Sequence, residues 1–196
     1  MADTLESDPR PLGLARVLSI QAHANRLANR RLQGALAGLS TSDLHARRIS
    51  FFPTLIGTLN HLLAVDRYYI AALHGEADMA QQYRRYAPHD ELAPYAAAQD
   101  ASDLKLIAFC DKLDDAGANA VVHMDRGEGK SQSDLACLVL AHLFMHQTHH
   151  RGQLHAMLAG TQVKPPQLDE FIMRADEPYR VMDMSGLGWT EREVYG

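Results

Sequence analysis

Three long segments repeat apolar residues every three or four positions, and this periodicity limits the chain to a largely helical fold. The segments are residues 12–39, 52–74 and 134–159. We expect the first helix to end near Gly38, and the last to begin after a capping Ser133 and to stop at Gly160. The middle segment is apolar around most of its circumference, which is typical of a helix buried among neighbours.

The remaining sequence predicts one further helix, two connections and a C-terminal extension. Residues 101–118 carry the apolar spacing of a helix. Residues 75–100 contain two prolines and few apolar pairs, so we expect a long, partly ordered connection there. Residues 121–133 alternate in polarity and contain two glycines, which predicts a short hairpin or loop. Residues 168–196 have room for one or two short helices.

Together these elements predict an all-α fold, an up-down four-helix bundle. A short hairpin or loop precedes its last long helix, and short C-terminal helices pack on the bundle. A chain of 196 residues suits one domain. We place that domain over residues 11–196 and expect residues 1–10 to form a flexible leader.

Charge and composition narrow the range of partners. Nineteen basic against 24 acidic side chains give a formal charge of −5, whereas nucleic acids require a basic surface, so no nucleic-acid partner is expected. No stretch approaches the roughly 18 apolar residues of a membrane span, so no membrane partner is expected either. Two cysteines make no disulfide framework and the N-terminus lacks the apolar core of a signal peptide, which predicts a cytoplasmic protein.

The chain has 11 histidines, and helical geometry sorts those of the last long helix. Residues four apart differ by about 40° around a helix. His142, His146 and His150 therefore share one face, whereas His155 lies nine residues past His146, about half a turn away. His149 lies on the flank of this face.

Two of these histidines interrupt an apolar stripe. His146 and His150 occupy positions where a bundle normally places leucines. A divalent ion is bound well by two imidazoles at this spacing, and His61 in the middle segment is a candidate third ligand. Three nitrogens leave a position open for a water of lowered pKa or for a thiolate. The alternative is a site without metal, in which core histidines share protons.

Two sequence motifs resemble those of the DinB/YfiT-like family of metal-dependent four-helix-bundle proteins. They are TLNHLLAVDRYYIAAL and, some 80 residues later, HQTHHRGQLHAML. The resemblance covers essentially the whole chain and implies a divalent metal held by His61, His146 and His150. It also implies a homodimer, and a small-molecule substrate with a low-molecular-weight thiol as co-substrate in some relatives and hydrolysis in others.

Two functions stay open from the sequence. One is a metal-dependent enzyme of the thiol-transferase or hydrolase type, and the other is a stress-response or binding module in which the metal only stabilises the bundle. Three imidazoles suit zinc, nickel, copper and iron alike. We expect zinc or nickel, and the catalytic group remains unknown beyond a metal-bound water or thiol.

Other polar residues of the predicted helices have structural interpretations. We expect His142 to be a core residue bonded to a neighbour, and Asp66 to be a carboxylate at a helix surface or between helices. Arg151 is expected to be solvated or salt-bridged, although it has the charge to bind an anionic substrate. Tyr68 and Tyr69 are candidates to line a pocket, although tyrosines in buried helices are more often core residues.

Overall fold

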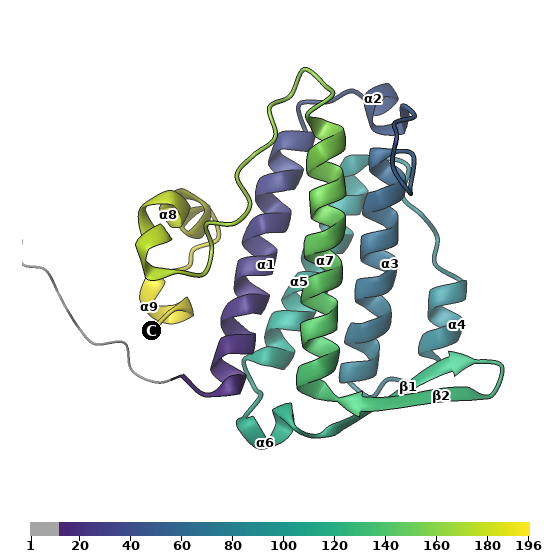
Figure 1. Cartoon of the computed structure of the whole chain (residues 1–196), viewed down its shortest axis with the longest axis vertical. Helices are drawn as coiled ribbons and strands as arrows, with labels where there is room; N and C mark the ends of the chain where they lie inside the picture. Colours follow the sequence, from purple (N-terminus) through teal and green to yellow (C-terminus); the bar gives the residue numbers. More distant parts are fainter. Residues whose placement is uncertain (1–11) are drawn as a thin grey trace, which may run out of the picture.

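Four long helices lie side by side and form the body of the molecule (Figure 1). The computed structural model describes residues 12–196, so the expected leader at residues 1–10 lies outside the described part. The long helices are α1 (Leu14–Leu36), α3 (Leu55–Leu73), α5 (Leu92–Cys110) and α7 (Ala136–Leu158). The expected mostly helical fold is thereby confirmed.

The order of the helices departs from simple up-down alternation, because α3 and α5 run in the same direction (Figure 1). Leu55 and Tyr95, near the starts of these helices, belong to one buried apolar cluster. Leu73 and Cys110, at their ends, belong to the other. The connection of residues 74–91, which includes α4 (Met79–Arg84), therefore returns the chain along the bundle. In α1 and α7 the chain runs in the opposite direction.

The third long helix begins nine residues earlier than its apolar spacing predicts. Helix α5 starts at Leu92, inside the segment expected to be a partly ordered connection. Pro94 lies in its first turn, where backbone N–H groups have no helical partner, so proline is tolerated there. The predicted end at residue 118 is wrong as well, because α5 stops at Cys110 and a separate short helix, α6 (Asp115–Ala118), follows.

A two-stranded antiparallel hairpin leads directly into α7. Its strands are β1 (Val121–Gly127) and β2 (Lys130–Leu135), which confirms the predicted hairpin. Ser133 pairs with His123 within the hairpin and is not the cap of α7. The N-cap is Leu135, without a side-chain cap, and the Ala136 N–H donates to the Ala120 carbonyl instead. The carbonyl of Ala120, the residue before β1, thus accepts the N–H at the start of α7 in place of the expected serine cap.

The C-terminal extension forms short helices beside α1 (Figure 1). They are a 3-10 turn (Arg174–Asp176), α8 (Glu177–Gly186) and α9 (Glu191–Val194). Arg180, which is 1% exposed, donates to both carboxylate oxygens of Glu191 and so joins α8 to α9. The predicted short C-terminal helices are confirmed. Helix α2 (Thr41–His45) lies between α1 and α3 in the chain.

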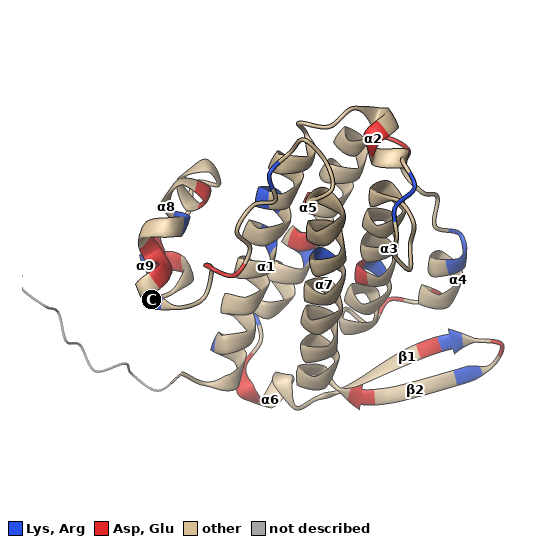
Figure 2. Cartoon of the chain, turned by 45° about the horizontal axis from the view of Figure 1, so that its top comes forward, with Lys and Arg blue, Asp and Glu red and all other residues tan. Residues whose placement is uncertain are grey.

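Charged side chains are spread over the peripheral elements and are scarce on the front of the bundle (Figure 2). Helix α7 carries one charged residue, Arg151, in 23 positions. Within residues 12–196, no helix combines the length and hydropathy needed to cross a membrane.

A polar layer separates the two apolar clusters of the bundle. On α7, Phe144 belongs to the first cluster and Leu154 to the second. His150 and Arg151 lie between them and are nevertheless buried. The candidate functional residues of the sequence thus fall in this layer.

Candidate metal centre

Three histidines from two helices meet at one point. His61 lies on α3, and His146 and His150 lie one turn apart on α7. One ring nitrogen from each lies within 4.8 Å of the other two. The Nε2 atoms of His61 and His146 are 3.1 Å apart although the residues are separated by 85 positions. The structure therefore brings together the three histidines singled out from the sequence.

Partial burial keeps these imidazoles neutral near pH 7. Removal from water, together with the smaller effect of the neighbouring His150, lowers the pKa of His61 to about 4 and that of His146 to about 3. Burial also lowers the pKa of His150. A neutral imidazole has a free lone pair, which is the form that binds a metal ion.

A hydrogen bond fixes the tautomer of His150. Its Nδ1 lies 2.8 Å from Oε1 of Gln153, an atom that only accepts, so Nδ1–H is the donor. This leaves the lone pair of His150 on Nε2. The amide nitrogen of Gln153 donates to Nε2 of His149 over 3.1 Å, which holds the amide in the matching orientation. His149 thus lies on the flank, as predicted, and acts through Gln153.

Phe52 covers the histidines from the segment before α3. Its ring stacks on His61 with centroids 4.3 Å apart and an interplanar angle of 29°. It also lies 5.8 Å from the His150 ring. This aromatic cover shields one side of the site from water.

The three residues fit a divalent ion with an open coordination sphere. Nitrogens bound to one zinc ion at about 2.0–2.1 Å stand roughly 3.3 Å apart in tetrahedral geometry, which is close to the separation of His61 and His146. The Nδ1 atom of His146 is buried without a hydrogen-bond partner. Among residues 12–196, no cysteine, aspartate or glutamate joins the group. The set could hold a metal ion and leave room for a further ligand.

Comparison with known proteins places the chain in a family. The model of the DinB family matches residues 20–179, which is most of the sequence. The chain belongs to the DinB family. No curated protein matches it. The DinB match begins within α1 and covers the whole of α3, α5 and α7, so it includes all three histidines.

The remaining histidines of α7 are not members of the triad formed by His61, His146 and His150. The Nε2–H of His155 donates to the Pro166 carbonyl, 3.1 Å away, on another side of the helix, as predicted. His142 was expected in the core, but it is exposed and its ring packs edge-on against Tyr69. That interpretation was wrong because the buried face of α7 passes through Gln147, which leaves His142 at the edge of the bundle.

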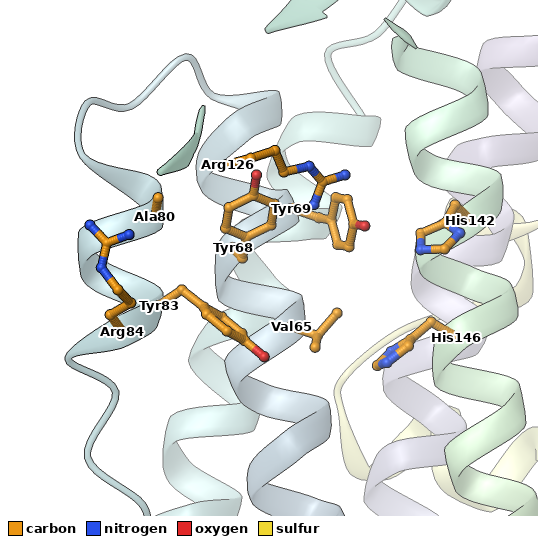
Figure 3. A pocket seen from close by; sticks show the side chains of 9 residues that line it. All are labelled: Val65, Tyr68, Tyr69, Ala80, Tyr83, Arg84, Arg126, His142 and His146. Atoms are coloured by element: carbon orange, nitrogen blue, oxygen red, sulfur yellow. The ribbon is translucent and has the colours of Figure 1, made fainter. Parts of the chain in front are cut away.

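A cavity of about 490 Å³ opens beside the triad, and His146 is part of its wall (Figure 3). Tyr68 and Tyr69 from α3, Tyr83 from α4 and His142 from α7 also line it. Tyr68 is buried, but its hydroxyl donates to the Asp125 carbonyl of β1 over 2.7 Å. Tyr68 and Tyr69 thus belong to the cavity wall, which was one of the two roles considered for them from the sequence.

A second cluster of polar side chains is buried where α7 packs against α1, and it was not predicted from the sequence. Arg151, expected to be solvated, is buried and donates to the side-chain oxygens of Asn25 and Asn29. Asp103 accepts from Asn29 and Gln99. The prediction for Arg151 was wrong because it follows Gln147 by one turn on the face that packs against α1.

Asp66 completes this buried group and is not part of the metal set. It is 1% exposed, and its Oδ2 accepts from Gln99 over 2.8 Å. The expected helix-packing role is thereby confirmed. Burial raises the pKa of Asp66 to about 6, and burial together with the Asp66 charge raises that of Asp103 to about 7. The charge of Arg151 lowers the pKa of both carboxyl groups, but amide side chains separate the guanidinium from them.

Proposed function

We propose that this DinB-family protein binds a divalent metal ion through His61, His146 and His150 and acts with it on a small substrate. The convergence of three ring nitrogens within 4.8 Å carries the proposal. When bound, such an ion supplies Lewis-acid activation of a substrate or nucleophile. The open side of the triad and the cavity next to His146 support an enzyme over a module in which metal only stabilises the bundle.

The chain's own residues prepare the site. Gln153 holds His150 with its Nε2 lone pair available, and the low pKa values of His61 and His146 keep both rings unprotonated. Phe52 excludes water from one side. The cavity on the His146 side gives a small molecule access to the ligand set.

Several finer features of the proposal rest on the family resemblance. They are zinc or nickel as the ion, thiol transfer or hydrolysis as the reaction, a low-molecular-weight thiol as co-substrate, and a homodimer. A cytoplasmic location is also part of the proposal, and it rests on the cysteine content of the chain. A non-catalytic, metal-stabilised stress-response module is the competing proposal. A cobalt-substituted protein separates the two, because added thiol changes the visible spectrum only when a coordination position is open.

The metal site is tested by titrating tag-free, metal-free protein with Zn²⁺ and Ni²⁺ in a calorimeter. We expect one ion per chain, and we expect His146→Ala to abolish binding because it removes one of three ligands. His155→Ala is the matched control from the same helix and should bind like the unmodified protein. Absence of uptake by the unmodified protein, or equal loss in both variants, would refute the proposal.

A further inference from the structure

The cavity beside His146 carries two guanidinium groups and no acidic side chain. Arg84 comes from the end of α4 and Arg126 from β1, so the hairpin and the crossover connection together form this wall (Figure 3). The lining includes no aspartate or glutamate. Within residues 12–196, neither arginine forms an ion pair. The cavity therefore has an excess of positive charge.

Arg126 is held in place by neutral groups. Its Nε and Nη2 donate to Oε1 of Gln132 across the hairpin, over 3.1 and 2.8 Å. Its guanidinium carbon lies 5.3 Å from the ring centroid of Tyr68 and 5.7 Å from that of Tyr69. A guanidinium has five N–H donors, so N–H groups of Arg126 remain available to a ligand. The side chain is thus oriented before any anion arrives.

Arg84 approaches the hairpin where Gly127 has no side chain. A Cβ atom at Gly127 would collide with the Arg84 guanidinium. Of the acidic residues of the hairpin, Asp125 accepts the Gly127 N–H with its Oδ1, and Glu128 pairs with Lys130, so neither forms an ion pair with these arginines. In Figure 2, basic residues of α4 and of β1 lie toward the same edge of the molecule. This edge can neutralise an anion without first breaking an ion pair.

The rest of the cavity wall is aromatic and apolar. Tyr68, Tyr69 and Tyr83 present ring surface, and Val65 lies between them and His146 (Figure 3). A volume of about 490 Å³ is in the range of small-molecule sites. An occupant with a flat apolar body and one anionic end would match both parts of the wall.

We propose that this cavity binds a small carboxylate with an aromatic or apolar body, and that Arg126, assisted by Arg84, recognises its carboxylate. The assignment deepens the proposed function and rests on it for one point only, that the apolar body extends toward the triad at His146. Charge-assisted hydrogen bonds from arginine, and the bidentate geometry that a guanidinium offers, favour a carboxylate over a neutral group of the same shape.

The probe is 1-naphthaleneacetate, compared with the isosteric neutral 1-naphthaleneacetamide. Calorimetric titrations are run on metal-free and on zinc-loaded protein. We expect the carboxylate to bind about tenfold or more tightly than the amide in both forms, because a hydrogen bond to a charged partner is the stronger one. Equal binding of the two compounds to the metal-free protein, or binding of neither, would overturn the proposal.

Substitutions test which residues cause the preference for the carboxylate over the amide. Arg126→Gln should remove most of the carboxylate preference, and Arg84→Gln should reduce it. Lys130→Gln in the same hairpin and Arg85→Gln, adjacent to Arg84 but outside the cavity lining, are the matched controls and should retain it. Circular dichroism verifies that each variant is folded. A preference that survives Arg126→Gln, or that falls equally in Lys130→Gln, would contradict the assignment.

The two forms of the protein separate this inference from the proposed function. A preference that depends on Arg126 in the metal-free protein supports the carboxylate site whether or not zinc is taken up. A preference that appears only with zinc and persists in Arg126→Gln shows recognition by the ion, which overturns the inference and leaves the metal site intact. Failure of zinc uptake refutes the metal site alone.

Discussion

At the scale of single residues, Gln153 connects the candidate ligands to their surroundings. Its amide oxygen accepts from Nδ1 of His150 and its amide nitrogen donates to His149. The two bonds determine each other, since reversing the amide would break both. Replacing a group that holds a ligand imidazole in this way typically lowers metal affinity by about 10- to 100-fold.

We predict that Gln153→Leu lowers zinc affinity by about 10- to 100-fold while His61, His146 and His150 all remain. The reason is that the His150 ring loses the acceptor that fixes its tautomer. Competition with a chromophoric chelator measures the change, and Gln81→Leu, at an exposed position of α4, is the control. Unchanged affinity in Gln153→Leu would show that the amide contributes nothing to ligand orientation.

At the scale of elements, the β1–β2 hairpin forms one wall of the cavity and continues into α7. Its turn contains Gly127 and Gly129, both with positive φ, at 80° and 73°. Only Gly127 also lies against the Arg84 guanidinium, whereas a Cβ at Gly129 would meet nothing within 4 Å. Both glycines therefore adopt a positive φ, but only Gly127 is in close contact with another side chain.

We predict that Gly127→Ala and Gly129→Ala each lower the free energy of unfolding by about 1 kcal/mol, because alanine is strained at positive φ. Urea unfolding measures this common loss. Only Gly127→Ala should displace Arg84, which is visible as a shifted Nε–Hε signal of that arginine in NMR spectra. An identical Arg84 signal in both variants would contradict the close approach.

The long helices were predictable from the sequence where large apolar residues mark a face, as in α1, α3 and α7. Helix α5 was only partly predictable, because its first half is rich in alanine and contains Pro94 at a position that resembles a break. The triad was predictable because two ligands share one helical face. The cavity was not, since it requires knowing that α4 and the hairpin approach α3.

At the scale of the whole molecule, the buried polar group links α1, α3, α5 and α7 through one arginine and two carboxyl groups. Asn25 and Asn29, Gln99 and Asp103, and Gln147 and Arg151 are each spaced four apart, as are His146 and His150. That spacing signals a polar stripe on each helix. The spacing does not determine which stripes face one another, so this buried group could not be predicted from the sequence.

We predict that the contribution of this group to the free energy of unfolding falls as the pH rises between about 4 and 7. Burial raises the pKa of Asp66 to about 6, so the folded chain keeps a proton that the unfolded chain releases near pH 4, and each step up in pH favours unfolding. Asp66→Asn removes this titration and leaves Asp103 alone with Arg151.

The measurement is urea unfolding of the unmodified protein and of Asp66→Asn at pH 5 and pH 8. From pH 5 to pH 8, the free energy of unfolding of Asp66→Asn should rise by on the order of 2 kcal/mol relative to that of the unmodified protein. Histidine titration contributes equally to both proteins and cancels in the comparison. Parallel pH profiles would show that Asp66 ionises in the folded chain as readily as in water.

The separation of His61 from His146 by 85 positions sets the order of events when the protein is made. During synthesis α3 leaves the ribosome long before α7, and His61 by itself is one imidazole on a helix. The pair on α7 joins it only after the last long helix has been synthesised and has packed against α3. Any ion held by all three is therefore acquired late, by a nearly complete molecule, and its delivery follows translation.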